Sequence, residues 1–339
     1  MYTSRNRRIH NVHFTPDGRR LVFSNVCVSP SVVILDLASQ KSFEVNLGTY
    51  LDYVLDLVPL SSDTIVVSTF GGTVVAVQVT EPAQQPLMTI QYDPNDEAGI
   101  LRMEGLLAEQ RARCRPTTRR LWSVEQVDGE WVDRTGLRCL ARLGDTALVW
   151  FAQKRDRYYD TRYDDDYDPE DTHWTDVVLA DTQGCIKHTV RYETHTVLAL
   201  AATCLNVAVL MKDGGIHILN DRLVEVQVLR VDNVGPHMVW WRNTLVIASA
   251  DNLVTTVDAE TGVELVQYGP APHPHHFGQT GLTSGPLAFA YVDSAGCLHM
   301  FDETGEISAQ PGRQLGAFHS DRYADVTMND TVASIQIEK

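Results

Sequence analysis

Short apolar runs recur along most of the chain, and their periodicity is that of β-strands. Runs of four to eight residues rich in Val, Ile, Thr and aromatic residues stand between polar positions, as in "DTIVVSTF", "NVAVLM" and "TLVIASA". Tight turns of the hairpin type separate them, for example "TFGGTV" and "MKDGGI". Helical periodicity is nearly absent. The pattern therefore predicts an all-β chain.

A larger repeat emerges when the strands are aligned on their acidic turns. An Asp follows a strand at Asp181, Asp221, Asp258 and Asp302, at intervals of 40, 37 and 44 residues. At a strand end the Asp side chain can bond local backbone N–H groups, and a nearby Gly supplies the positive φ that such turns need. A four-stranded unit every ~40 residues is a propeller blade. The repeat therefore predicts a single β-propeller domain over residues 1–339.

Two segments interrupt this repeat, at 93–120 (28 residues) and at 155–176 (22 residues). The 289 residues outside them give about 41 per blade for seven blades and about 48 for six. Because a blade usually takes ~40–45 residues, seven four-stranded blades are favoured, with six or eight left open. The C-terminal "RYADVTMNDTVASIQIEK" supplies only about two strands. We therefore expect N-terminal residues to complete the last blade and to remove its exposed edges.

The most specific stretch is "HNVHFTPDGRRLVFSN", residues 10–25. Its "FTPDGRRL" core resembles the FSPDGxxL hairpin of WD40 and related propeller families. The resemblance implies that Phe14 packs between blades, that Pro16-Asp17-Gly18 forms the turn, and that Leu21 and Phe23 open the next strand. Because the chain has no strand-ending Trp-Asp dipeptide and no blade-opening Gly-His pair, the resemblance implies a WD40-like propeller without that family's hydrogen-bond set.

A second resemblance lies in "VDAETGVELV". Asp258, Thr261 and Gly262 match the AxDxxTGxxxW motif of quinoprotein-type propellers, whereas Thr256 and Val266 replace its Ala and Trp. The resemblance implies a quinoprotein-like turn. It does not imply quinone chemistry, because that chemistry occurs in exported proteins and no export signal is visible here.

Composition narrows the class of partner. The 339 residues are 44% hydrophobic and 21% charged, with a formal net charge of −16. That charge disfavours nucleic acid and acidic membranes and leaves basic proteins as partners. No run of 18 apolar residues and no secretory h-region is visible, and the six cysteines are scattered without a CxxC pair. We expect a soluble, reduced protein of the cytoplasm or nucleus that has no membrane segment.

The first insert combines a helix with a basic stretch. "PNDEAGILRMEGLLAEQRARCRP" predicts one short helix, with caps at Asn95 or Asp96 and a stop at Pro116. Its basic end carries five arginines and no acid: Arg111, Arg113, Arg115, Arg119 and Arg120. This candidate basic patch could contact RNA or phosphates, but no aromatic residues interleave it, so a solvated or internally paired loop is favoured.

The second insert is acidic and rich in tyrosine. Residues 155–176 hold nine acids and three arginines, a net charge of −6. The spacing Asp164-x-Asp166-x-Asp168 imitates a calcium loop, but Pro169 and Thr175 stand where an EF-hand needs Gly and Glu. A weak surface Ca²⁺ site stays open.

Tyrosine is enriched at interfaces, and we predict a partner-contact loop. Its candidate residues are Tyr158, Tyr159, Tyr163, Asp164, Asp165, Asp166, Tyr167 and Asp168. Two partners remain open, the arginines of the first insert and a separate basic protein, with plain disorder as the bland alternative.

Two further motifs have simpler explanations. His273, His275 and His276 could bind zinc, but a Pro-rich connecting loop is favoured. Alternation in Trp240-Trp241 would put one ring in the core and the other outside, where it could mark a surface contact, although blade packing is the stronger explanation.

No nucleophile elbow, P-loop or other catalytic constellation is visible, and no cofactor is expected. We therefore predict a non-enzymatic scaffold that mediates protein–protein interaction within a larger complex. The alternatives are a propeller-class enzyme or metal-binding protein with a site near the central channel, and an RNA-associated propeller that uses the patch from Arg111 to Arg120.

Overall fold

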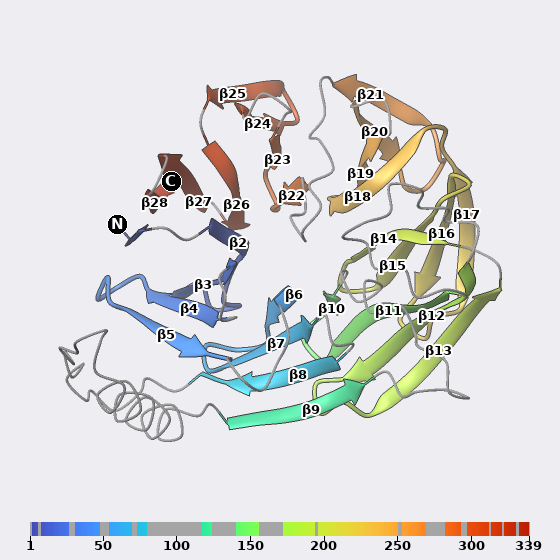
Figure 1. Ribbon diagram of the computed structural model, residues 1–339. Coiled ribbons are helices and arrows are strands. Elements are labelled where there is room, and N and C mark those ends of the chain that lie inside the picture. Colours follow the sequence, from blue (N-terminus) through green and yellow to red (C-terminus); the bar gives the residue numbers. More distant parts are fainter. Residues whose placement is uncertain are drawn as a thin grey trace, which may run out of the picture.

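The chain winds into a ring of small sheets around a central axis (Figure 1). This computed structural model describes residues 2–5, 8–26, 31–47, 54–69, 73–79, 117–123, 140–155, 172–193, 196–249, 253–268, 282–292, 297–311, 313–320, 322–329 and 332–338. Within these ranges the regular structure is all β-strand. None of the described residues forms a helix able to span a membrane. The all-β propeller prediction is confirmed.

The described strands form seven four-stranded antiparallel sheets, which we number as blades from the innermost strand outward. Blade 1 consists of β2 (Arg8–Phe14), β3 (Arg20–Val26), β4 (Ser31–Asp36) and β5 (Ser42–Asn46). Blade 2 consists of β6 (Val54–Pro59), β7 (Thr64–Thr69), β8 (Thr73–Gln78) and β9 (Thr117–Ser123). Blade 3 consists of β10 (Leu140–Leu143), β11 (Ala147–Arg155), β12 (Thr172–Asp181) and β13 (Ile186–Glu193).

The remaining sheets continue around the ring. Blade 4 consists of β14 (Val197–Ala202), β15 (Asn206–Met211), β16 (Gly215–Asn220) and β17 (Glu225–Arg230). Blade 5 consists of β18 (Val234–Trp241), β19 (Thr244–Ser249), β20 (Val254–Asp258) and β21 (Glu264–Tyr268). Blade 6 consists of β22 (Leu282–Ser284), β23 (Phe289–Val292), β24 (Cys297–Asp302) and β25 (Gly305–Pro311). Blade 7 consists of β26 (Arg313–His319), β27 (Arg322–Asn329), β28 (Val332–Glu338) and β1 (Tyr2–Arg5).

Blade 7 joins the two ends of the chain. β1 pairs with β28 in an antiparallel register that runs from Tyr2 opposite Ile335 to Arg5 opposite Val332. The innermost strands contact one another in the closed order β2, β6, β10, β14, β18, β22, β26 and back to β2. The predicted completion of the last blade by N-terminal residues is confirmed, and it leaves no unpaired edge at β28.

The core lies between neighbouring blades. Strands β6 and β7 are buried at nearly every position, because each sheet is covered on both faces by the next blades. Trp150 is fully buried among side chains of blades 2 and 3. As predicted, Phe14 packs between blades, against Ala317 and Ala324 of blade 7, and Leu21 and Phe23 are fully buried in β3. By contrast, the outermost strand β13 is mostly exposed.

Two faces of the disc follow from the antiparallel pairing. We call the face with the turns between first and second strands, and between third and fourth strands, the front face. The turns between second and third strands lie on the back face. A long central strand such as β12, with ten residues, separates the two faces by about 30 Å at ~3.3 Å per residue.

Both predicted inserts are too long. Thr117–Arg120 belongs to β9, and Thr172–Asp176 belongs to β12. Both stretches were mistaken for loop because they carry mainly polar side chains and lack an apolar run. Residues 93–116, including the predicted helix, and residues 156–171 lie outside the described residues. In sequence, the second insert falls between two paired strands of one blade, β11 and β12, as predicted.

Candidate functional site

A cavity of about 200 Å³ occupies the centre of the ring. Innermost strands of blades 1 to 6 supply most of its wall. The lining residues are His13, Asp56, Leu140, Ala141, Ala199, Leu200, Ala201, Ala202, Pro236, His237, Met238, Val239, Trp240 and Leu282. The wall is mainly apolar, and its titratable side chains are Asp56 and two imidazoles.

Bulges in the innermost strands place residues on this wall. The register between first and second strands shifts between His10 and His13 in blade 1, and between Val54 and Asp56 in blade 2. A comparable shift precedes His237 in blade 5. A β-bulge bends its strand and re-aims the side chain that follows it. Because alternation of polar and apolar residues does not reveal a bulge, these cavity residues were not predicted from the sequence.

Asp56 links two blades from inside the core. One of its carboxylate oxygens accepts a hydrogen bond from the Leu57 backbone N–H at 2.8 Å. The other accepts from the Leu140 N–H of blade 3 at 2.9 Å. Burial raises the pKa of the Asp56 carboxyl to about 7, although both hydrogen bonds act to lower it. A polar residue within the apolar run "VLDLVP" was the available sequence signal for this site.

His13 carries the opposite shift. Burial lowers the pKa of its imidazole to about 4, so that near neutral pH the ring is uncharged. The cavity lining thus holds a carboxyl group whose pKa is raised and an imidazole whose pKa is lowered. Such a pair can exchange a proton with a small polar ligand or hydrogen-bond to it. Within the described residues, no group of three or more His, Cys, Asp or Glu side chains is placed to hold a metal ion.

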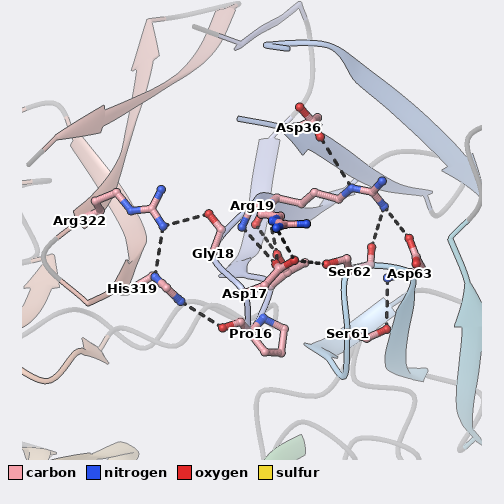
Figure 2. A network of polar contacts seen from close by, with 12 residues as sticks. Pro16, Asp17, Gly18, Arg19, Asp36, Ser61, Ser62, Asp63, His319 and Arg322 are labelled. Carbon is pink, nitrogen blue, oxygen red and sulfur yellow. Dashed lines mark hydrogen bonds and ion pairs between the residues drawn. The ribbon is translucent and has the colours of Figure 1, made fainter. Parts of the chain in front are cut away.

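A second polar cluster lies on the front face, where blades 7, 1 and 2 meet (Figure 2). Arg322 of blade 7 donates to the Gly18 carbonyl at 2.9 Å, and His319 Nε2 lies 3.3 Å from the Pro16 carbonyl oxygen. On the other side, Arg20 donates to the Ser62 carbonyl of blade 2 at 2.7 Å. These bonds fasten blade 1 to blade 7 on one side and to blade 2 on the other.

The Pro16-Asp17-Gly18 turn is the centre of this cluster. Gly18 has a φ of 63°, which favours glycine, so the predicted turn is confirmed. Asp17 accepts from the Thr15 hydroxyl at 2.7 Å and from the Arg19 N–H at 3.1 Å, and also from the Ser62 hydroxyl. Desolvation opposes these bonds, but together they lower the pKa of Asp17 to about 2. The motif that resembles WD40 hairpins therefore has a structural role in closing the ring.

The acidic turns at the ends of third strands behave as predicted, with one correction. Asp258 accepts from the Thr261 N–H and hydroxyl, both at 2.7 Å, and Gly262 has a φ of 73°. In blade 4 the repeat position is Asn220 and not Asp221. The Asn220 side chain accepts from Arg222 N–H at 2.9 Å and from Val224 N–H at 3.0 Å. The error arose because Asn and Asp can both make this turn and stand next to each other.

This correction predicts different costs for two neighbouring substitutions. We expect Asn220→Ala to lower the free energy of unfolding by about 1–2 kcal/mol, because two backbone N–H groups lose their acceptor. Asp221→Ala changes an exposed side chain and should stay within about 0.5 kcal/mol of the wild type. Urea denaturation of both variants measures the difference. A larger loss for Asp221→Ala would contradict the assignment.

Of the predicted basic patch, only its last two residues are described. Arg119 lies in β9 and donates to the Thr182 carbonyl of blade 3 at 3.0 Å and to the Gln183 side chain. Arg120 is an exposed residue of the same strand. Arg111, Arg113 and Arg115 lie outside the described residues. Arg119 therefore contributes to the contact between blades 2 and 3.

The predicted contact loop also lies outside the described residues. This applies to Tyr158, Tyr159, Tyr163, Asp164, Asp165, Asp166, Tyr167 and Asp168, and to the histidines His273, His275 and His276. Its last acid, Asp176, is described and pairs with Arg191 through two bonds of 2.8 Å. The Arg191 guanidinium lies 4.3 Å from the centre of the Trp174 ring. The end of the predicted insert is thus an ordered part of blade 3.

The favoured explanation of the tryptophan pair, blade packing, is confirmed, whereas the expected outer position of one ring is wrong. Both rings are half-buried. Trp240 donates to the Ala201 carbonyl of blade 4 at 3.1 Å, whereas Trp241 packs on Phe289 of blade 6 at 5.0 Å between ring centres. Alternation does separate the rings, but both faces of a propeller blade are covered by neighbours.

Comparisons with known proteins support the architecture alone. No family model and no curated protein matches the sequence. Among solved structures, the chain is similar to BamB from Moraxella catarrhalis, with a TM-score of 0.53 and 14% identity. The match covers 97% of this chain and 85% of that one. At this identity the likeness shows a shared β-propeller fold.

Proposed function

We propose that this β-propeller is a non-enzymatic scaffold that binds one or more proteins within a larger complex. The observation that carries the proposal is the closed ring, in which β1 completes blade 7 and the front-face cluster fastens blade 1 on both sides. A closed disc holds its loops and outer strands in fixed positions, which suits simultaneous contacts with other proteins. We further propose that the seven described sheets are the full set of blades in a WD40-like or quinoprotein-like ring.

We also propose that the acidic loop contacts a separate basic protein. The loop leaves blade 3 at Arg155 and returns at Thr172, which pair on the back face. The arginine-rich segment returns to blade 2 at Thr117, which pairs with Gln78 on the front face. The two roots lie on opposite faces of the disc, which favours a separate basic protein over the arginine-rich segment as the partner. The candidate contacts are Tyr158, Tyr159, Tyr163, Asp164, Asp165, Asp166, Tyr167 and Asp168.

Deletion of Asp160–Asp171 tests the loop separately from the fold. We expect the melting temperature to stay within about 2 °C of the wild type, because β11 and β12 keep their pairing. Retention of the partner should fall at least tenfold. A variant with the four tyrosines changed to serine keeps the charge and should show a similar loss if the rings supply contact area. A drop in melting temperature of 10 °C or more would show that the loop is structural.

Affinity purification of the tagged chain from its native source, followed by quantitative mass spectrometry, tests the scaffold itself. We expect at least one protein to co-purify in near-stoichiometric amount. We propose a reduced compartment, cytoplasm or nucleus, in keeping with the free thiols of Cys185 and Cys204. Recovery of the chain alone would count against the scaffold.

A second candidate function is a small-ligand or metal site in the central cavity. It corresponds to the alternative of a propeller-class enzyme or metal-binding protein with a site near the central channel. The observation that favours it is the placement of Asp56 and His13 on one wall with pKa values shifted in opposite directions. Elemental analysis of the purified chain tests for metal. One equivalent of metal that is lost in an Asp56→Asn variant would support this function in place of the scaffold.

A further inference from the structure

Exposed apolar side chains concentrate on the outer rim of three consecutive blades. Nine large hydrophobic residues are exposed among the described residues, and seven of them lie on or directly before the outermost strands of blades 3, 4 and 5. These are Ile186 on β13, Val224, Val226 and Val228 at β17, and Val263, Leu265 and Val266 at β21. Exposed apolar side chains that gather in one part of a surface mark interaction sites more often than scattered ones do.

β17 combines these side chains with an open sheet edge. It is the last strand of its sheet, so on its outer side the described residues include no pairing strand. Val226 and Val228 are 57% and 51% exposed and alternate along the strand. Such an edge offers unpaired N–H and C=O groups beside apolar side chains, the combination that a further strand can use.

Another outer strand of the same ring is built differently. β9 of blade 2 exposes Thr117, Thr118, Arg119 and Arg120. Charged residues on an edge strand are a common protection against unwanted pairing. β17 lacks this protection at its centre, where Val226, Gln227 and Val228 follow one another, so its apolar character is specific to this part of the rim.

A buried hydroxyl without a partner lies beside β17. The Tyr192 hydroxyl of β13 is buried and makes no hydrogen bond to any described residue. Its ring contacts the His217 ring at 5.1 Å, and His217 Nδ1 lies 2.5 Å from a Glu225 carboxylate oxygen at the start of β17. Burial, and then the Glu225 carboxylate, raises the pKa of the phenol to about 12. These contacts join β13 of blade 3 to the start of β17.

The charges around this rim favour a basic occupant. Apart from Arg222 in the turn before β17, the cations of this rim are each paired with a carboxylate of the same blade: Lys187, Arg191 and Arg230. Residues 259–268, which include β21, carry Glu260 and Glu264 and no Lys or Arg. The chain as a whole carries −16, so edge-to-edge pairing of two copies would bring like charges together. A segment with Lys or Arg between its apolar residues would meet opposite charge instead.

We propose that the outer edge of β17 binds an extended segment of a basic partner protein, which adds to blade 4 as a fifth strand. The apolar residues of this segment would pack on Val226 and Val228, and its basic residues would lie near Glu225 and the acids of β21. Backbone pairing would supply affinity, and the valine row would set the register. The inference rests on the proposed scaffold function and deepens it by naming a surface and a partner chemistry.

Titration with a fluorescent nonapeptide of alternating lysine and valine tests the site on the purified chain. We expect measurable binding by anisotropy at ~0.15 M salt. Two probes should bind at least tenfold more weakly: the same peptide with glutamate for lysine, and one with alternate N-methyl groups that block strand pairing. Failure of the lysine–valine peptide to bind, or equal binding of all three peptides, would overturn the proposal.

Matched variants locate the binding. Val226→Lys with Val228→Lys should weaken binding at least tenfold, as should the neutral Val226→Thr with Val228→Thr. Thr117→Lys with Thr118→Lys places the same charges on β9 and should leave binding unchanged. If the β9 variant loses as much peptide binding as the β17 variant, long-range charge repulsion explains the loss, and the proposal is contradicted. If the natural partner co-purifies equally with the Val226→Lys, Val228→Lys variant, this inference fails while the scaffold function stands.

Discussion

Replacement of Gly214 by alanine is expected to lower the free energy of unfolding by about 3 kcal/mol, from a single added methyl group. Gly214 has a φ of 85°, which costs an L-residue roughly 1–2 kcal/mol. A β-carbon there would lie 2.1 Å from the Val231 carbonyl oxygen. Because that atom belongs to the backbone, the chain itself must move, and overpacking of this kind adds roughly 1–3 kcal/mol. The same move would strain the 3.0 Å bond from Val231 N–H to the Gly214 carbonyl.

Gly144→Ala is the matched control for this prediction. Gly144 has a φ of 60°, but the nearest atom to its β-carbon, the Cys204 carbonyl oxygen, would lie at 3.5 Å. We expect a loss of only about 1 kcal/mol, from the backbone conformation alone. Urea denaturation with a common m-value measures both losses. Equal losses would show that the contact between Gly214 and Val231 is not as tight as described.

The second large effect is a pair of opposite pH dependences from the central cavity. The folded pKa of Asp56 is raised from 3.8 to about 7, so folding takes up a proton between these values. Its stabilising contribution is therefore full at low pH and is lost as pH rises through 7. The folded pKa of His13 is lowered from 6.5 to about 4. Its contribution is full above pH 6.5 and is lost as pH falls through 4.

Between pH 4.5 and 6.5 these two contributions change in opposite directions by up to ~1.4 kcal/mol per pH unit. His13→Leu should therefore lose stability relative to the wild type as pH rises through this window. Asp56→Asn should gain relative stability over the same window and up to pH 8. For each variant, the free energy of unfolding is measured by urea denaturation at steps of one pH unit, and the wild-type value at the same pH is subtracted. This subtraction cancels the contributions of the other titrating groups. Two difference curves with the same sign of slope would contradict the opposite pKa shifts.

Local patterns predicted much of the fold because a propeller repeats local units. Alternating runs gave the strands, and "FTPDGRRL" gave a turn whose Gly18 has the positive φ that the motif requires. The closure by N-terminal residues followed from the shortage of strands at the C-terminus. The strands and the turn depend on residues that are close in sequence. The closure depends only on the need for a fourth strand in the last sheet.

Features that depend on neighbouring blades could not be predicted in the same way. Trp240 and Trp241 both pack against neighbouring blades, because blades 4 and 6 cover the two faces of blade 5. Thr117–Arg120 looked like loop because the outermost strand of a blade carries polar side chains. His13 and Asp56 reach the central cavity through bulges, which no periodicity shows. The exposed valines of β17 look like ordinary core residues until the sheet order places them at an edge.

We propose above that the ring serves as a protein scaffold. Affinity purification of the tagged chain, with the loop deletion and the Val226→Lys, Val228→Lys variant purified in parallel, tests it most directly. We expect a near-stoichiometric protein with the wild type and at least tenfold less of it with each variant. Recovery of the wild-type chain without any stoichiometric protein would contradict the scaffold function.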